Sequence, residues 1–314
     1  RPEFSRDIFS FEWGYSWHSH YTPAYKHHLK VLDLNFLHFA YINESFRKSM
    51  PLITQILNYR DQFVLGASYL FRYNSLNDYR LSSSPWVHNL RLYLQSSGAM
   101  LYGLSQLTNR ERDSYGSYRL FGTNFAQFVK GEFDYSGLRK LSEGNSFAYH
   151  LGLALAVPYG NSQFVPVDLR YFAGGANSIR GWSARSLGPG SMPRSMSKSI
   201  FDQVGDIKLE LNAEYRMRIL GPIQLALFAD AGNVWTIRPY ENQPQGDFKW
   251  RTFYREIALA TGMGLRWDFE YFVLRFDTGA KVYDPQVENG RPWVITYQSP
   301  RDLLALHFAI GYPF

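Results

Sequence analysis

The chain has 314 residues, a formal net charge of +6 and no cysteine, and 18% of its residues are aromatic. The lack of cysteine excludes disulfides and thiolate metal sites. The 33 lysine and arginine residues are scattered along the chain without a basic run, so the positive charge does not indicate nucleic-acid binding.

Apolar residues are spread among polar ones, because the mean hydropathy is -0.31 despite 23 tyrosines and 24 phenylalanines. No run approaches the roughly 18 apolar residues that a membrane helix needs. Two fold classes fit this composition: a soluble all-β protein, and a transmembrane β-barrel whose lipid-facing and lumen-facing residues alternate. The aromatic excess favours the barrel, since Trp and Tyr form belts at both membrane interfaces.

The first predicted strand, residues 9–17, carries the clearest membrane pattern. One face holds Phe9, Phe11, Trp13, Tyr15 and Trp17, and the other holds serine, glutamate and glycine. Five aromatic side chains on one face would cause aggregation in water, whereas they are ordinary in lipid. The pattern therefore predicts a membrane strand.

The same alternation predicts eleven strands, six before a glycine-rich segment at 160–204 and five after it. They span residues 9–17, 30–40, 62–73, 87–97, 124–135, 147–157, 208–217, 225–234, 257–269, 271–281 and 304–314. Short turns at 220–222 and 269–271 alternate with longer loops, as in barrels with one short-turn side. We expect one all-β domain over 1–314, a transmembrane antiparallel β-barrel. Such barrels normally close with an even strand number, so the odd count indicates a missed strand or a fragment.

Charged residues recur on the inward face of the later strands. A hydrated lumen tolerates charge that a dry core would not, so we expect a polar wall with mixed ion pairs. Its members are Lys208, Glu210, Glu214, Arg216, Asp230, Arg266, Asp268, Arg275 and Asp277.

Residues 174–190 contain five glycines and one proline. This composition forces turns and lets the backbone pass close to other groups. Arg180 lies in this stretch between an apolar residue and a glycine. The loop either positions one guanidinium or carries a solvated arginine, and its composition alone does not separate the two interpretations.

Several short motifs resemble the Omp85 superfamily (the BamA/TamA family) of outer-membrane assembly proteins. Ile179-Arg180-Gly181-Trp182 is similar to its Val-Arg-Gly-Phe signature on extracellular loop six, with two conservative changes, and Leu187-Gly188-Pro189-Gly190 matches the continuation. Residues 228–232 resemble its Phe-x-Asp-x-Gly strand motif, and 213–215 place a glutamate on the preceding strand. Residues 308–314 look like its C-terminal targeting signal. The resemblance is clear over 147–314.

The resemblance implies sixteen strands in the intact protein, with the signature loop between strands eleven and twelve. This chain would then begin near strand six, with the earlier strands and the periplasmic POTRA repeats absent. No signal peptide is visible at residues 1–4, so we expect a missing precursor region. The loop would fold into the lumen, where Arg180 meets Glu214 and Asp230 in a structural lock.

The resemblance also implies a function in inserting or translocating proteins at the bacterial outer membrane. An unfolded strand would add to the seam between the first and last strands, where Phe308, Ile310, Gly311, Tyr312 and Phe314 lie. The alternative for the last strand is simple closure of the barrel. Expected partners are unfolded outer-membrane proteins, accessory periplasmic or lipoprotein subunits and the lipid bilayer, with no cofactor. A two-partner secretion pore or a passive channel shares these features.

A barrel enzyme would need a nucleophile beside a base. The strand histidines His150 and His307 have no such neighbour at a persuasive spacing, so we expect no catalytic residue. A second histidine group lies at a strand end and lacks acidic support, which favours a polar rim over a metal site. It comprises His18, His20, His27 and His28.

Overall fold

The computed structural model describes residues 4–19, 23–49, 61–81, 83–113, 116–197, 202–269 and 271–314. His20, Glu270 and positions 198–201 of the glycine-rich segment lie outside these residues. The chain divides into two compact units. The first comprises Arg1–Arg72, Leu92–Glu132 and Leu155–Arg170, and the second comprises Tyr73–Arg91, Phe133–Ala154 and Tyr171–Phe314. The single domain expected from the sequence stays a prediction.

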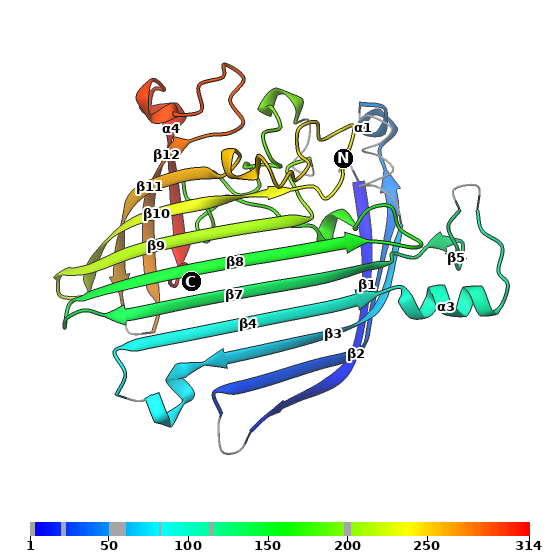
Figure 1. The fold of residues 1–314 in the computed structure, drawn as a ribbon, viewed down its shortest axis with the longest axis horizontal. Helices are drawn as coiled ribbons and strands as arrows, with labels where there is room; N and C mark the ends of the chain where they lie inside the picture. Colours follow the sequence, from blue (N-terminus) through cyan, green and yellow to red (C-terminus); the bar gives the residue numbers. More distant parts are fainter. Residues whose placement is uncertain are drawn as a thin grey trace. The chain divides into compact units, whose positions relative to one another are not determined.

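Eleven strands form one sheet, in which strands that follow one another along the chain are neighbours and β1 and β13 stand at the two ends (Figure 1). The pairs β1–β2 and β9 to β13 are antiparallel. The prediction of eleven sheet strands is confirmed. They are β1 (Phe4–His18), β2 (Tyr25–Ile42), β3 (Gln62–Asn74), β4 (Trp86–Ser97), β7 (Phe128–Lys140), β8 (Asn145–Pro158), β9 (Ile207–Leu220), β10 (Ile223–Trp235), β11 (Ala258–Asp268), β12 (Val273–Tyr283) and β13 (Leu304–Ile310).

Several expected strand boundaries are wrong: β1 and β2 each begin five residues earlier than expected, and two other strands differ for a reason visible in the backbone. The fifth strand, expected at 124–135, is β7 at Phe128–Lys140, and 119–124 form a separate hairpin of β5 (Arg119–Leu120) and β6 (Thr123–Asn124). Phe121 and Gly122 have φ of 50° and 79°, the positive values that a tight hairpin turn requires. The last strand ends at Ile310 instead of 314, because Gly311 has φ of 87° and breaks the extended conformation.

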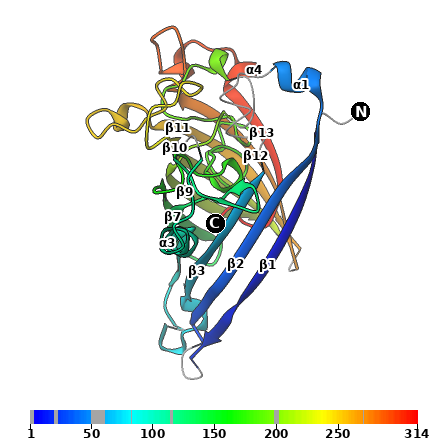
Figure 2. The same ribbon diagram turned by 90° about the vertical axis from the view of Figure 1, so that its right-hand side faces the viewer.

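The connections alternate in length. Short ones lie at 141–144, 221–222 and 269–272, and long ones lie at 159–206, 236–257 and 284–303. Within the first unit, β1, β2 and β3 run side by side (Figure 2). Short helices occur in the connections: α1 (Glu44–Ser49), α3 (Ala99–Leu107) and α4 (Pro300–Leu303). Among the described residues, no helix is long and apolar enough to cross a membrane.

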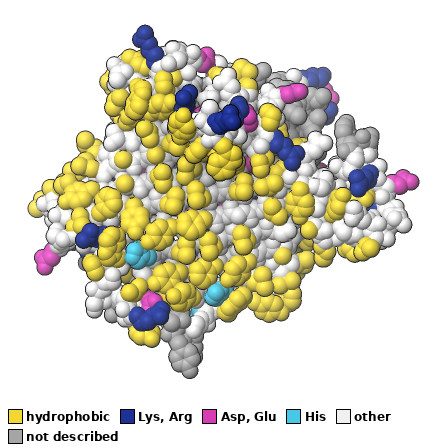
Figure 3. Space-filling view, in the orientation of Figure 1, with side chains coloured by type: hydrophobic (Ala, Val, Ile, Leu, Met, Phe, Trp, Pro, Cys, Tyr) yellow, Lys and Arg dark blue, Asp and Glu magenta, His cyan; other side chains and the backbone are white. Residues whose placement is uncertain are grey.

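One face of strands β9 to β13 is apolar and exposed; we call it the apolar face. On β11 it carries Met263, Leu265 and Trp267, whose exposed fractions are 58%, 49% and 47%. Leu306 and Phe308 continue it on β13. Figure 3 shows hydrophobic side chains spread over the face it presents, with charged side chains mainly near its margins. The alternation read from the sequence is confirmed in these strands.

The opposite face of the same strands is charged and largely buried; we call it the loop face. Glu214, Arg266 and Arg275 are 0% exposed there. Part of the segment 171–206 returns onto this face and covers them. The expected ion pairs are present, but the expectation of a hydrated wall is wrong where the loop excludes water. Lys208 and Asp268, nearer the strand ends, keep partial exposure.

Candidate functional site

A tight hairpin carries the signature tetrapeptide onto the loop face. The Gly175 amide donates to the Trp182 carbonyl at 2.8 Å, and the Trp182 amide donates to Ile179 at 3.1 Å. Gly174 has φ of 93°, and a Cβ there would lie 2.3 Å from the Ser183 carbonyl oxygen. Only glycine allows this approach. All four residues of the tetrapeptide, 179–182, are buried.

Arg180 joins two strands through one guanidinium. Its Nε and Nη2 donate to the two carboxylate oxygens of Asp230 on β10, both at 2.8 Å. Its Nη1 donates to Glu214 Oε2 on β9 at 2.5 Å, and its backbone amide donates to Asp230 at 3.0 Å. The predicted meeting of Arg180 with Glu214 and Asp230 is present in the structure, and all three side chains are 0% exposed. The solvated-arginine interpretation does not hold.

The aromatic ring of Phe228 packs against the Arg180 guanidinium. The centroid of the Phe228 ring lies 3.5 Å from Arg180 Cζ, a cation–π contact that strengthens when desolvated. Gly262 on β11 faces Phe228, and a Cβ there would lie 2.5 Å from Phe228 Cζ. The glycine therefore leaves the space that the ring occupies.

Glu214 binds three arginines. Besides Arg180, it accepts from Arg216 Nε at 2.8 Å and from Arg266 Nη2 at 2.9 Å. Burial alone would lower the pKa of Arg180, but hydrogen bonds and charge from Asp230 and Glu214 raise that pKa above its ordinary value. The guanidinium therefore keeps its charge, and the pairing offsets the cost of desolvating these groups.

The cluster extends across β11 and β12. Arg266 Nη1 donates to Asp277, and Arg275 Nε lies 3.2 Å from the other oxygen of that carboxylate. Arg275 also donates from Nη2 to Asn177 Oδ1 of the loop at 2.5 Å. This second contact fixes the residue three positions before Arg180.

Polar side chains hold the loop backbone beside the ion pairs. Asn212 Nδ2 donates both to Asp230 Oδ1 and to the Ser178 carbonyl, each at 2.9 Å. The Ser178 hydroxyl donates to Glu210 and accepts from the Gly174 amide. The loop is therefore bonded through its backbone as well as through Arg180.

The loop tip also reaches β12 and β13. A Cβ on Gly279 of β12 would lie 2.0 Å from the Arg180 carbonyl oxygen. On β13, His307 Nε2 lies 2.9 Å from the same oxygen. Because a carbonyl oxygen only accepts, Nε2 carries the hydrogen in this bond.

The predicted gate residues divide into two groups. Phe308 and Ile310 lie on the apolar face with exposed fractions of 60% and 68%. Alternation along the predicted strand 304–314 would continue that row with Tyr312 and Phe314, which is wrong, because the turn at Gly311 redirects them. Arg216 Cζ lies 4.3 Å from the Tyr312 ring centroid, and Phe314 stacks on His150 at 5.7 Å.

The remaining histidines show no catalytic or metal arrangement in the part of the chain that the structure describes. His150 contacts Asn212 and Asp134 beside Phe314, and none of these supplies a hydroxyl or thiol nucleophile. His27 stacks on Trp17 at 5.1 Å, and no group of three metal-ligating side chains occurs among the described residues. His18 and His28 bond to a serine carbonyl and a serine hydroxyl. The absence of enzyme activity stays a prediction.

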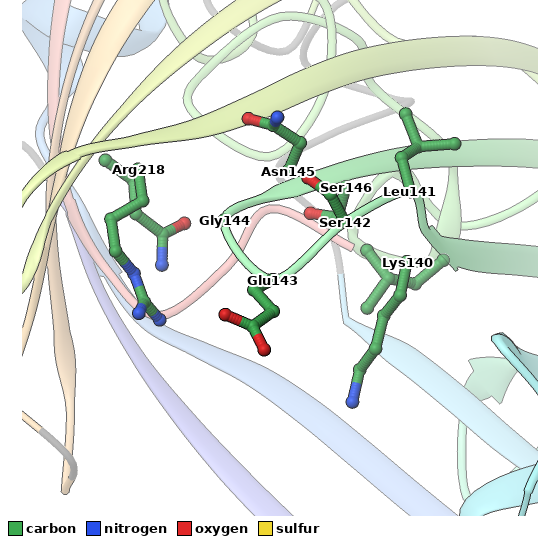
Figure 4. A pocket seen from close by; sticks show the side chains of 10 residues that line it. Lys140, Leu141, Ser142, Glu143, Gly144, Asn145, Ser146 and Arg218 are labelled. Atoms are coloured by element: carbon green, nitrogen blue, oxygen red, sulfur yellow. The ribbon is translucent and has the colours of Figure 1, made fainter.

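A hollow of about 720 Å³ lies beside the turn between β7 and β8. Figure 4 shows Lys140 at the end of β7 and Glu143 in the turn, with Arg218 nearby on β9. None of its lining residues belongs to the Arg180 cluster. The hollow is therefore separate from the lock.

The profile of the Omp85 superfamily domain matches residues 9–314. The chain belongs to the Omp85 superfamily. The sequence resemblance is confirmed, and it extends well upstream of residue 147. At the level of the family, membership supports a bacterial outer-membrane β-barrel protein.

Three known proteins are similar to this chain. The outer membrane protein assembly factor BamA of Neisseria meningitidis serogroup B is 26% identical over 142 residues, which cover 39% of this chain and 18% of that protein. The crystal structure of BamA from Haemophilus ducreyi lacking POTRA domains 1–3 matches with a TM-score of 0.60 and 17% identity, over 98% of this chain and 54% of that one. CdiB from Escherichia coli matches with a TM-score of 0.52 and 11% identity, over 97% and 45%. This chain spans about half the length of these solved structures. Their similarity to it shows that the chain has the same fold over the matched part.

The motifs of this Omp85 chain predict the centre of the site but not its surroundings. Alternation predicts Arg266, Arg275 and Asp277 only as members of a general polar wall. Phe228 shares the face of Asp230 by simple alternation, which is a signal that could have placed its ring beside Arg180. Nothing in the local sequence indicated that His307 would bond to a residue 127 positions away.

Proposed function

We propose that this chain is part of a factor that inserts or translocates proteins at the bacterial outer membrane, as a multi-pass barrel, and that it acts by strand addition at β13. The observation that carries the proposal is the length of β13. It has seven residues, fewer than any other strand of the eleven-stranded sheet, so the fewest backbone pairs hold it. A weakly held strand can open and offer backbone N–H and C=O groups to an incoming strand.

In this function the Arg180 cluster would hold the strands beside β13 in place. Strand addition needs an edge that opens while the wall beside it keeps its register. The buried ion pairs tie the loop to β9 and β10, and Arg266 and Asp277 extend the ties to β11 and β12. The wall next to β13 is therefore held on its loop face by side chains as well as by the backbone ladder.

The proposed partners follow from this mechanism. Unfolded outer-membrane proteins would supply the incoming strand, and accessory periplasmic or lipoprotein subunits would deliver it. The apolar face would contact lipid. Strand exchange forms only hydrogen bonds, so we propose no cofactor, no catalytic residue and no enzyme activity.

A two-partner secretion pore or a passive channel is the alternative function, because it would use the same loop and wall. Two measurements separate it from assembly. A pore conducts ions freely in planar bilayers. The number and type of periplasmic repeats in the full-length precursor sequence distinguish an assembly factor from a secretion pore.

The direct test is site-specific photo-crosslinking in the full-length protein within outer membranes. A photoreactive phenylalanine analogue at Phe308 should capture unfolded outer-membrane proteins during their assembly. Phe276 is a matched control, because it also lies on the apolar face, its ring is 5.0 Å from Phe308, and its strand is paired on both sides. Equal capture at both positions, or capture at neither, would argue against strand addition at β13.

A further inference from the structure

His307 is the largest side chain that β13 presents to the loop face. The strand alternates between exposed Leu304, Leu306, Phe308 and Ile310 and the less exposed Ala305, His307 and Ala309. Alanine reaches no further than Cβ. Contact between this strand and the loop therefore depends on one imidazole.

The loop backbone leaves no space for a side chain from β12 at this point. A Cβ on Gly279 would lie 2.0 Å from the Arg180 oxygen and 2.5 Å from its carbonyl carbon. Gly279 faces Ala305 in the register, and Asp277 faces His307. The imidazole thus reaches over β12 and donates to the Arg180 carbonyl at 2.9 Å.

Arg180 is consequently held from two directions. Its amide and guanidinium bind carboxylates on β9 and β10, and its carbonyl oxygen binds β13. We propose that His307 is a positioning residue that couples the Arg180 lock to the edge strand, so that β13 stays on the sheet more firmly when the loop is seated.

The coupling works in both directions. Anything that displaces the loop removes a hydrogen bond from β13, and anything that draws β13 away removes one from the loop tip. The role of this coupling in accepting an incoming strand rests on the function proposed above. The coupling itself is a property of the chain and is measurable without assembly activity.

Amide hydrogen exchange of the full-length protein in lipid nanodiscs tests it. His307→Ala should speed exchange of the 304–310 amides about fivefold, the factor that one hydrogen bond of about 1 kcal/mol provides. His307→Gln keeps an N–H donor of similar reach and should restore most of the protection. Leu306→Ala is the control, because Leu306 is 79% exposed on the apolar face, and it should leave exchange of residues 178–182 unchanged.

A double-mutant cycle distinguishes coupling from a purely local effect. Asp230→Asn loosens the loop and should speed β13 exchange in the parent protein, but add little in the His307→Ala background. An equal effect of Asp230→Asn in both backgrounds would overturn the proposal. So would wild-type exchange of β13 in His307→Ala, or failure of His307→Gln to differ from His307→Ala. Because exchange is read without a substrate, these results stand apart from the crosslinking outcome at Phe308.

Discussion

Two ion pairs in this chain each join a strand glutamate to a cation, and they have opposite surroundings. Glu12 on β1 binds Lys30 on β2, and their side chains are 62% and 25% exposed. Glu214 on β9 binds Arg180 of the loop, and both side chains are 0% exposed. An exposed pair in water adds little stability, whereas a buried charge that loses its partner is costly.

The difference comes from what covers each face. Thr261 and Met263 show that β11 is exposed on its apolar face, but its opposite face lies beneath the loop. The residues of β1 from Ser5 to His18 are exposed on both faces. Alternation therefore predicts which way a side chain points, and a segment distant in sequence decides whether it is buried.

The largest expected effect is that of Arg180→Ala. It leaves Glu214 and Asp230 in the interior without their shared cation, so the free energy of unfolding should fall by about 3–5 kcal/mol. Thermal unfolding in detergent micelles, together with heat-modifiable gel migration, measures this loss. The same variant should lose function. Unchanged heat stability and function would contradict the role of Arg180 as a structural lock.

Gly279→Ala should have the next largest effect. Its new Cβ would lie 2.0 Å from the Arg180 oxygen, so the loop tip has to shift, at a cost of about 1–3 kcal/mol. Trypsin sensitivity of the loop and the unfolding temperature report the shift. Gly131→Ala is a matched strand control, because a Cβ there meets only Leu94 at 3.7 Å. Equal trypsin sensitivity and equal unfolding temperatures of Gly279→Ala and Gly131→Ala would contradict this prediction.

Glu256 provides an intermediate case between the buried and exposed pairs. It lies in the connection between β10 and β11, and burial raises the pKa of its carboxyl, although the Trp235 indole N–H donates to it at 2.7 Å and opposes the shift. The folded state therefore holds the proton more tightly than the unfolded state. Stability should fall as the pH rises from the unfolded value of about 4.3 through the raised folded pKa.

Glu256→Gln removes this titration and keeps a carbonyl that accepts from Trp235. Unfolding temperatures measured over a pH series should therefore fall less steeply for the variant in the same window. Parallel curves for the two proteins would show that Glu256 does not contribute to the pH dependence.

The smallest effect is expected for Glu12→Gln. Its partner Lys30 remains solvated, and salt screens an exposed pair. The unfolding temperature in low salt should match that of the parent within error. A loss as large as that of Arg180→Ala would mean that exposure does not separate the two pairs.

The sequence predicted the strands well because each has one exposed apolar face, which imposes a period of two. It predicted Arg180, Glu214 and Asp230 together through motifs in the correct order. It could not predict the inward turn of Tyr312 and Phe314, because alternation carries no signal for the positive φ of Gly311. The contact from His307 depends on register across β12 and on the height of the loop, neither of which leaves a local pattern.

The loop tip touches β9, β10, β12 and β13 through one arginine and its two flanking peptide groups. Traction applied to the β13 end of the chain is thereby distributed over several strands at once. These strands therefore resist separation one hairpin at a time. They separate together when Arg180 is pulled away from Glu214 and Asp230.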